Sequence, residues 1–97
     1  MKIGIIGAGW AGMAAAVQAT KNGHTAIVFE AARTLGGRAR ALNATLPNGV
    51  EATLDNGQHI LIGAYADSLQ LMAEVGVPEQ DALLRLPMSL RFPDGQG

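Results

Sequence analysis

The segment IGIIGAGWAGMAAA, residues 3–16, places three glycines at the spacing G-x-G-x-x-G between a short apolar run and an alanine-rich run. A strand is predicted over Lys2–Ile6, because its residues are apolar on both faces, as in a strand covered on both sides. A helix is predicted over Trp10–Lys21, which is rich in helix formers. Asn22-Gly23 should end that helix. A second buried strand at Thr25–Phe29 would complete a right-handed, parallel β-α-β unit.

The three glycines of this turn have separate expected roles. Gly7 permits the tight turn, Gly9 lets the backbone approach a ligand, and Gly12 lets the helix pack closely on the strands. The first N–H groups of the helix point at the same space and carry partial positive charge, so a pyrophosphate fits there. The candidate cofactor-binding backbone comprises Gly7, Ala8, Gly9, Trp10, Ala11 and Gly12.

An acidic residue at the end of the second strand sharpens this interpretation. Glu30 follows Thr25–Phe29 directly, where a carboxylate can accept hydrogen bonds from both hydroxyls of an adenosine ribose. The same carboxylate would repel a 2′-phosphate, so the site favours FAD or NAD over NADP. The alternative is a glycine-rich turn that only serves packing, with Glu30 as a solvated strand end.

Composition narrows the class of protein. The 97 residues are 48% hydrophobic and 15% charged, with a formal charge of −1, which indicates a globular domain without a global field for nucleic acid or anionic membranes. There are no cysteines, so we expect no disulfide or thiolate metal site, and no metal site of any kind is predicted. No apolar run approaches the roughly 20 residues of a spanning helix. A secretory signal ending at Val17-Gln18-Ala19 is the alternative to a cytoplasmic protein, but the glycines in that stretch weaken it.

In the middle of the chain, the spacing of apolar residues changes to the two-residue period of a β-strand. Apolar residues alternate with polar ones over Arg40–Leu54, around a favoured Asn48-Gly49 turn, which predicts a β-hairpin. A further strand is predicted at about Gln58–Ile62.

The last third of the chain is expected to contain two helices and a strand. Asp67 and Gln70 have the spacing of a capped helix start, with a stop at Gly76. Pro78 can open a short helix to about Arg85. A strand is predicted at Met88–Phe92, before a Pro93-Asp94-Gly95 turn. Because no later strand returns to pair with it, we expect residues 1–97 to be the N-terminal part of a longer protein, an incomplete domain that lacks its closing strands and its substrate domain.

A second glycine motif follows the acidic residue. The segment Ala31-Ala-Arg-Thr-Leu-Gly-Gly-Arg38 resembles the Gly-Gly-Arg motif of the flavin amine oxidase and phytoene desaturase superfamily. The resemblance implies a Rossmann-like α/β fold that binds FAD, with the arginine at the place of Arg38 against the phosphates. A guanidinium fork matches phosphate oxygens. Many members carry arginine where this chain has Ala32, so the role of the neighbouring Arg33 stays open. The residues added to the candidate site are Glu30, Ala31, Arg33, Gly36, Gly37 and Arg38.

Two later segments are more particular. Residues 54–65, LDNGQHILIGAY, and 84–91, LRLPMSLR, are similar to the squalene-associated FAD-dependent desaturases, the hydroxysqualene dehydroxylases of bacterial hopanoid synthesis. The resemblance implies an FAD-dependent oxidoreductase that converts a C30 isoprenoid alcohol to squalene, with peripheral membrane association through its remaining part. Residues 1–97 alone are expected to be inactive. The alternatives are part of a carotenoid desaturase or amine oxidase, and a non-catalytic module that binds an adenine dinucleotide.

One histidine belongs to the same resemblance. Asp55, Gly57 and His59 match the family's Asp-x-Gly-x-His pattern near the flavin, which makes His59 a candidate cofactor-binding residue. A single histidine before an apolar run is also typical of a structural hydrogen-bond donor. No catalytic residue is assigned from the sequence.

Overall fold

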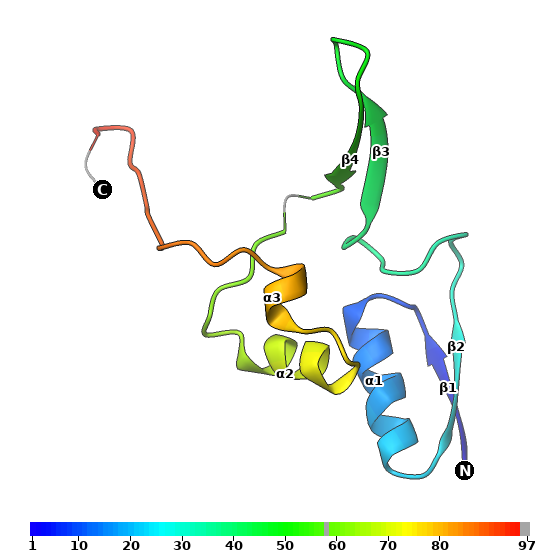
Figure 1. The fold of residues 1–97 in the computed structure, drawn as a ribbon. Coiled ribbons are helices and arrows are strands. Elements are labelled where there is room, and N and C mark those ends of the chain that lie inside the picture. The colour runs from blue at the N-terminus through cyan, green and yellow to red at the C-terminus, as the bar shows by residue number, and fades with distance from the viewer. Residues whose placement is uncertain (58, 96–97) are drawn as a thin grey trace. The chain divides into compact units, whose positions relative to one another are not determined.

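The first strand, helix and second strand form a β-α-β unit. β1 (Lys2–Ile6) lies parallel to β2 (Thr25–Phe29), and α1 (Trp10–Lys21) connects them and packs against both (Figure 1). The predicted bounds of all three elements are confirmed. The computed structural model describes residues 1–57 and 59–95, and it divides into two units, Met1–Leu61 and Ile62–Gly97.

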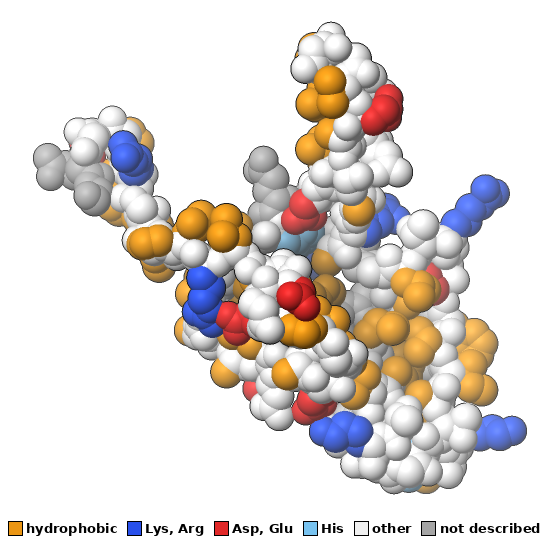
Figure 2. Space-filling model, in the orientation of Figure 1, with side chains coloured by type: hydrophobic (Ala, Val, Ile, Leu, Met, Phe, Trp, Pro, Cys, Tyr) orange, Lys and Arg blue, Asp and Glu red, His pale blue; other side chains and the backbone are white. Residues whose placement is uncertain are grey.

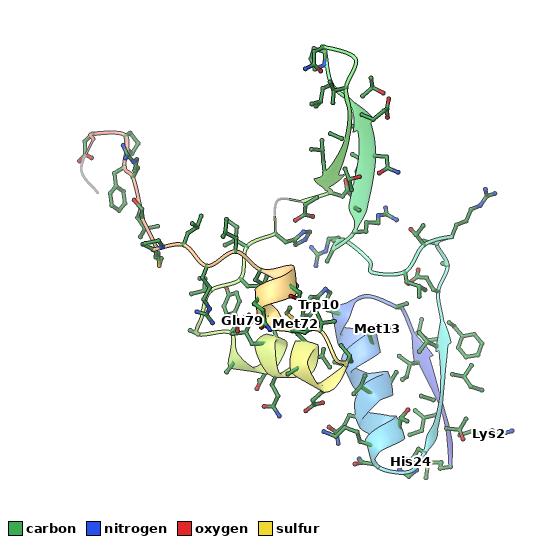
Figure 3. The ribbon with its side chains drawn as sticks, in the orientation of Figure 1. Lys2, Trp10, Met13, His24, Met72 and Glu79 are labelled. Carbon is green, nitrogen blue, oxygen red and sulfur yellow. The ribbon has the colours of Figure 1, made fainter. Side chains whose placement is uncertain are left out.

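The end of α1 is also as predicted. Asn22 is the C-cap, and Gly23 adopts a φ of 81° while its N–H donates to the carbonyl of Thr20. A glycine in this left-handed conformation ends a helix at little steric cost. His24 follows at the entrance to β2 (Figure 3).

The β1–β2 sheet is covered on one face only. Ile5 lies on the face that meets α1, 3.5 Å from the position of a Cβ built on Gly12. On the opposite face Ile6, Ile27 and Phe29 are 87%, 45% and 55% exposed, and Figure 2 shows hydrophobic side chains at the surface over these strands. The prediction that both faces are covered is therefore wrong for the described residues, since one helix covers only one side of a sheet.

The predicted hairpin is present. β3 (Ala41–Thr45) pairs antiparallel with β4 (Glu51–Asp55), with Leu42 opposite Leu54. The turn contains Asn48 and Gly49 as predicted, and the Asn48 side chain accepts a hydrogen bond from the Val50 N–H at 3.1 Å. This asparagine bond fixes the turn that sets the register of the two strands.

The strand predicted at Gln58–Ile62 is wrong where it can be judged. Gln58 lies outside the described residues, and residues 59–62 form no strand. Among the described residues no neighbouring strand pairs with this segment, and an apolar run without a pairing partner does not form a β-ladder.

The helix predicted from Asp67 is present, but its predicted cap is not. α2 (Ala66–Glu74) begins after Tyr65, and no side chain caps it. Asp67 therefore lies inside the first turn, where its carboxylate interacts favourably with the positive end of the helix dipole. The Gln70 side chain donates to the Glu74 carboxylate instead of reaching back to the helix start. The chain turns at Gly76 as predicted, with a φ of 81°.

The final segments differ more from prediction. α3 (Glu79–Ala82) is shorter than the predicted helix, because Leu83 is already extended, and Pro78 caps the helix rather than entering it. Residues 88–92 form no strand, and within the described part of the chain nothing pairs with them. The turn at 93–95 is present, with the Gly95 N–H donating to Phe92.

Candidate functional site

The glycine turn is held to the second strand and to its own helix. The Gly7 N–H donates to the Phe29 carbonyl at 2.7 Å, and Gly7 has a φ of 97°, as its predicted role in the turn requires. A Cβ built on Gly12 would lie 1.9 Å from the Gly7 carbonyl oxygen. Gly12 is therefore required for the close packing that the sequence predicts.

The second glycine motif packs on the first. The Gly36 N–H donates to the Ala8 carbonyl at 2.8 Å, and a Cβ on Gly37 would lie 3.3 Å from the Cα of Gly9. Ala8 is fully buried beneath this contact. Two segments of backbone meet here without intervening side chains, so the glycines of both motifs form one structure.

The start of α1 presents backbone donors. Gly9 is the N-cap and has no side chain to accept from them, and the first N–H groups of any α-helix lack partners within the helix. Gly9 itself is extended, with a φ of −78°. Trp10 is the first helical residue and is 44% exposed (Figure 3). Together the donors at Gly9, Trp10, Ala11 and Gly12 form a positively polarised cradle that suits an anion.

The Glu30 carboxylate lies at the edge of this cradle. One of its oxygens accepts from the Ala8 N–H at 2.7 Å, and the other accepts from the Ala32 N–H at 3.0 Å. The Ala32 and Ala8 N–H groups hold the pKa of Glu30 below its usual value, with smaller contributions from the Ala31 N–H and the Arg40 guanidinium. Glu30 is therefore an ionised acceptor that is directed at the glycine turn.

The sequence pattern does not predict the contact between Glu30 and the Ala8 N–H. This contact means that Glu30 already uses one donor of the turn, while each carboxylate oxygen has further lone pairs for a ribose hydroxyl. The donors from Gly9 onward are separate from this contact. The residues present thus fit the ADP portion of a dinucleotide.

The arginines of the loop differ in their contacts. Arg33 and Arg38 are exposed and, among the described residues, neither forms a hydrogen bond or ion pair. Arg40, which is not among the predicted site residues, donates to the Thr34 hydroxyl at 3.1 Å and lowers the pKa of Glu30 through its charge. A signal for Arg40 was available, because it follows the Gly-Gly-Arg motif by two residues.

The predicted histidine is paired elsewhere. His59 contacts Asp55 through its backbone N–H at 2.6 Å and its Nδ1 at 2.8 Å. This contact lowers the pKa of Asp55. No hydrogen bond joins His59 to the glycine turn within the described residues. The structure therefore brings the backbone donors and Glu30 together, and it places His59 in a separate arrangement.

The hollows, possible metal ligands and helices of the described residues give no further indication of a cofactor or metal site. Two hollows, of about 310 and 340 Å³, lie in the unit of residues 62–97 and are not lined by the glycine turn. The part of the chain that the structure describes contains no group of three or more His, Cys, Asp or Glu side chains that could hold a metal ion. None of the helices found there has the length and apolar character needed to cross a membrane.

Comparison with known proteins agrees with this geometry. Residues 5–75 match the family described as NAD(P)-binding Rossmann-like domain. This range includes both glycine motifs, Glu30 and the β3–β4 hairpin.

Individual relatives carry two kinds of name. The chain is 36% identical over 80 residues to 15-cis-phytoene desaturase of Synechococcus elongatus, covering 82% of this chain and 16% of the relative. It is 33% identical over 85 residues to zeta-carotene desaturase of Capsicum annuum, covering 88% and 14%. It is 34% identical over 89 residues to hydroxysqualene dehydroxylase of Sinorhizobium fredii, covering 92% and 20%. The chain thus spans no more than a fifth of the length of these relatives, all of which are named for oxidoreductase reactions.

Proposed function

The chain belongs to the family of NAD(P)-binding Rossmann-like domains, and from this premise we propose that it binds the ADP portion of FAD as the dinucleotide-binding segment of an oxidoreductase. The observation that carries the proposal is the Glu30 carboxylate, held 2.7 Å from the Ala8 N–H beside the uncapped start of α1. This arrangement offers a carboxylate for the ribose and backbone donors for the pyrophosphate.

Two features of the chain support this proposal, the first by distinguishing FAD and NAD from NADP. The ionised Glu30 disfavours the extra phosphate of NADP, because two negative charges would face each other. The exposed Arg38, which pairs with no described residue, supplies a guanidinium for the cofactor phosphates. Bound FAD would supply hydride-transfer chemistry, while the residues of this chain bind and orient its ADP portion.

The substrate class is the finer part of the proposal. We infer that the longer protein acts on a C30 isoprenoid and converts hydroxysqualene to squalene, on the basis of residues 54–65 and the similarity to a hydroxysqualene dehydroxylase. The first alternative is a carotenoid desaturase, which the phytoene and zeta-carotene desaturase relatives favour. An apolar isoprenoid as substrate and a cytoplasmic location stay predictions.

Calorimetry of FAD binding tests the site. Glu30→Gln and Arg38→Ala should each weaken affinity by about 10- to 100-fold, the scale of one charge-assisted hydrogen bond. Arg91→Ala is the matched control, since Arg91 is exposed and lies outside the site, and its affinity should equal that of the parent chain. Unchanged affinity in both site variants would refute the assignment. A chain that binds ADP-ribose but not FAD would favour a non-catalytic module.

A further inference from the structure

The loop after β4 contains a second polar arrangement, outside the glycine turn. Asp55 ends β4, and both of its carboxylate oxygens contact His59. Oδ2 accepts the His59 backbone N–H at 2.6 Å, and Oδ1 lies 2.8 Å from the ring Nδ1. One carboxylate thus fixes both the backbone and the ring of the same residue.

A glycine completes the arrangement. A Cβ built on Gly57 would lie 2.5 Å from Cε1 of the His59 ring and 3.1 Å from each ring nitrogen. The ring therefore occupies the space that any side chain at position 57 would need. Glycine at this position allows the imidazole to lie directly against the loop backbone.

The contact with Asp55 determines where the ring proton lies. An ionised carboxylate only accepts hydrogen bonds, and the hydrogen bonds from His59 hold the pKa of Asp55 below its usual value, so it is ionised at neutral pH. A nitrogen facing it must carry a hydrogen. In the neutral ring, a proton on Nδ1 leaves Nε2 with a free lone pair.

We propose that Asp55 is a positioning residue that keeps the proton of neutral His59 on Nδ1 and presents Nε2 as a hydrogen-bond acceptor for a ligand hydroxyl or N–H group. The His59 side chain is 44% exposed, so the ring is accessible. The inference depends on Asp55, Gly57 and His59 and not on dinucleotide binding, so refuting one of the two proposals does not refute the other.

The chain contains its own comparison, because it has two histidines. The His24 backbone N–H donates to the Ala19 carbonyl, but its imidazole forms no hydrogen bond or ion pair with any residue that the structure describes. Long-range ¹H–¹⁵N spectra of the imidazoles, recorded at a pH where both rings are neutral, distinguish the two tautomers. We expect the Nδ1-protonated pattern at His59 and the mainly Nε2-protonated pattern of free histidine at His24.

Three variants test whether Asp55 and Gly57 determine the tautomer of His59. Asp55→Ala should convert the His59 pattern to that of His24, and Asp67→Ala, which removes an exposed carboxylate elsewhere, should leave both patterns unchanged. Gly57→Ala retains Asp55 but displaces the ring, and it should also abolish the Nδ1-protonated pattern. If Asp55→Ala unfolds the hairpin and its NMR signals are lost, Gly57→Ala provides the test of the tautomer instead. A His24-like pattern at His59 in the parent chain, or no change in either loop variant, would overturn the proposal.

A chemical probe tests whether Nε2 of His59 is accessible to a ligand. Diethyl pyrocarbonate acylates an imidazole nitrogen with a free lone pair, and peptide mass mapping identifies the modified ring. We expect acylation of His59 in the parent chain. Reaction at His24 with none at His59 would show that Nε2 is blocked, and would overturn the proposal.

Discussion

Glu30 is the residue on which the proposed site depends. Its two oxygens accept the N–H groups of Ala8 and Ala32, so the carboxylate joins the end of β2 to the glycine turn. The motif and the position of an acid after β2 were readable from the sequence. The bond to Ala8 was not, because it depends on the direction of a side chain that no spacing rule fixes.

Acidification should release this contact. The pKa of Glu30 is lowered from its ordinary value of 4.5 by the Ala32 and Ala8 N–H groups. Its contribution to stability is therefore complete above that value and is lost as the pH falls below it, through the lowered pKa. The amide signals of Ala8 and Ala32 should shift together over this range in an NMR titration from about pH 6 to about pH 3.

Glu30→Gln provides the control for that titration. The amide side chain does not ionise in this range, so the shift of the Ala8 signal should disappear. If the parent chain and the variant give the same titration curve, the carboxylate does not bond to Ala8 in solution.

At the scale of elements, the helix start and the two glycine motifs act as one structure. β1, α1 and β2 were predictable because local periodicity, glycine placement and helix ends agree there. Residues 59–62 and 88–92 were predicted as strands and are not, because apolar alternation specifies a strand only when a second strand lies beside it. The N-cap predicted at Asp67 is also wrong, because α2 already begins at Ala66 and Asp67 is its second residue.

Two glycines of the turn should separate folding from binding. In Gly12→Ala the new Cβ would meet the Gly7 carbonyl oxygen at 1.9 Å, and we expect a loss of about 1–3 kcal/mol in the free energy of unfolding. In Gly9→Ala the nearest atom to the new Cβ is 3.9 Å away and φ is −78°. We expect the free energy of unfolding to change by less than about 1 kcal/mol, because the gain from a less flexible unfolded chain offsets the loss of glycine at the N-cap.

FAD affinity, unlike stability, should fall when Gly9 is replaced. A methyl group there stands where a ligand would approach the donors of α1, so Gly9→Ala should weaken FAD binding by about tenfold or more. Urea unfolding and calorimetry measure the two properties. A variant at Gly9 that binds FAD as well as the parent chain would mean that the ligand does not approach this backbone.

At the scale of the whole molecule, the described residues bury little. Only Ala8 and Ala19 belong to the core, and Ile6, Ile27 and Phe29 lie exposed on one face of the β1–β2 sheet. The sequence predicts buried strands from their composition, since apolar residues on both parities are typical of covered sheets. What covers the second face is a property of other segments, and no pattern within these strands contains that information.

The proposed function requires that the donors at the start of α1 and the Glu30 carboxylate together bind an ADP group. An NMR titration of the ¹⁵N-labelled chain with ADP-ribose examines each of these donors separately. We expect saturable shifts of the Ala8, Gly9, Trp10, Ala11 and Gly12 amide signals, and smaller shifts in Glu30→Gln. Saturable shifts confined to other residues, or no shift at these five amides at concentrations that saturate the chain, would contradict it.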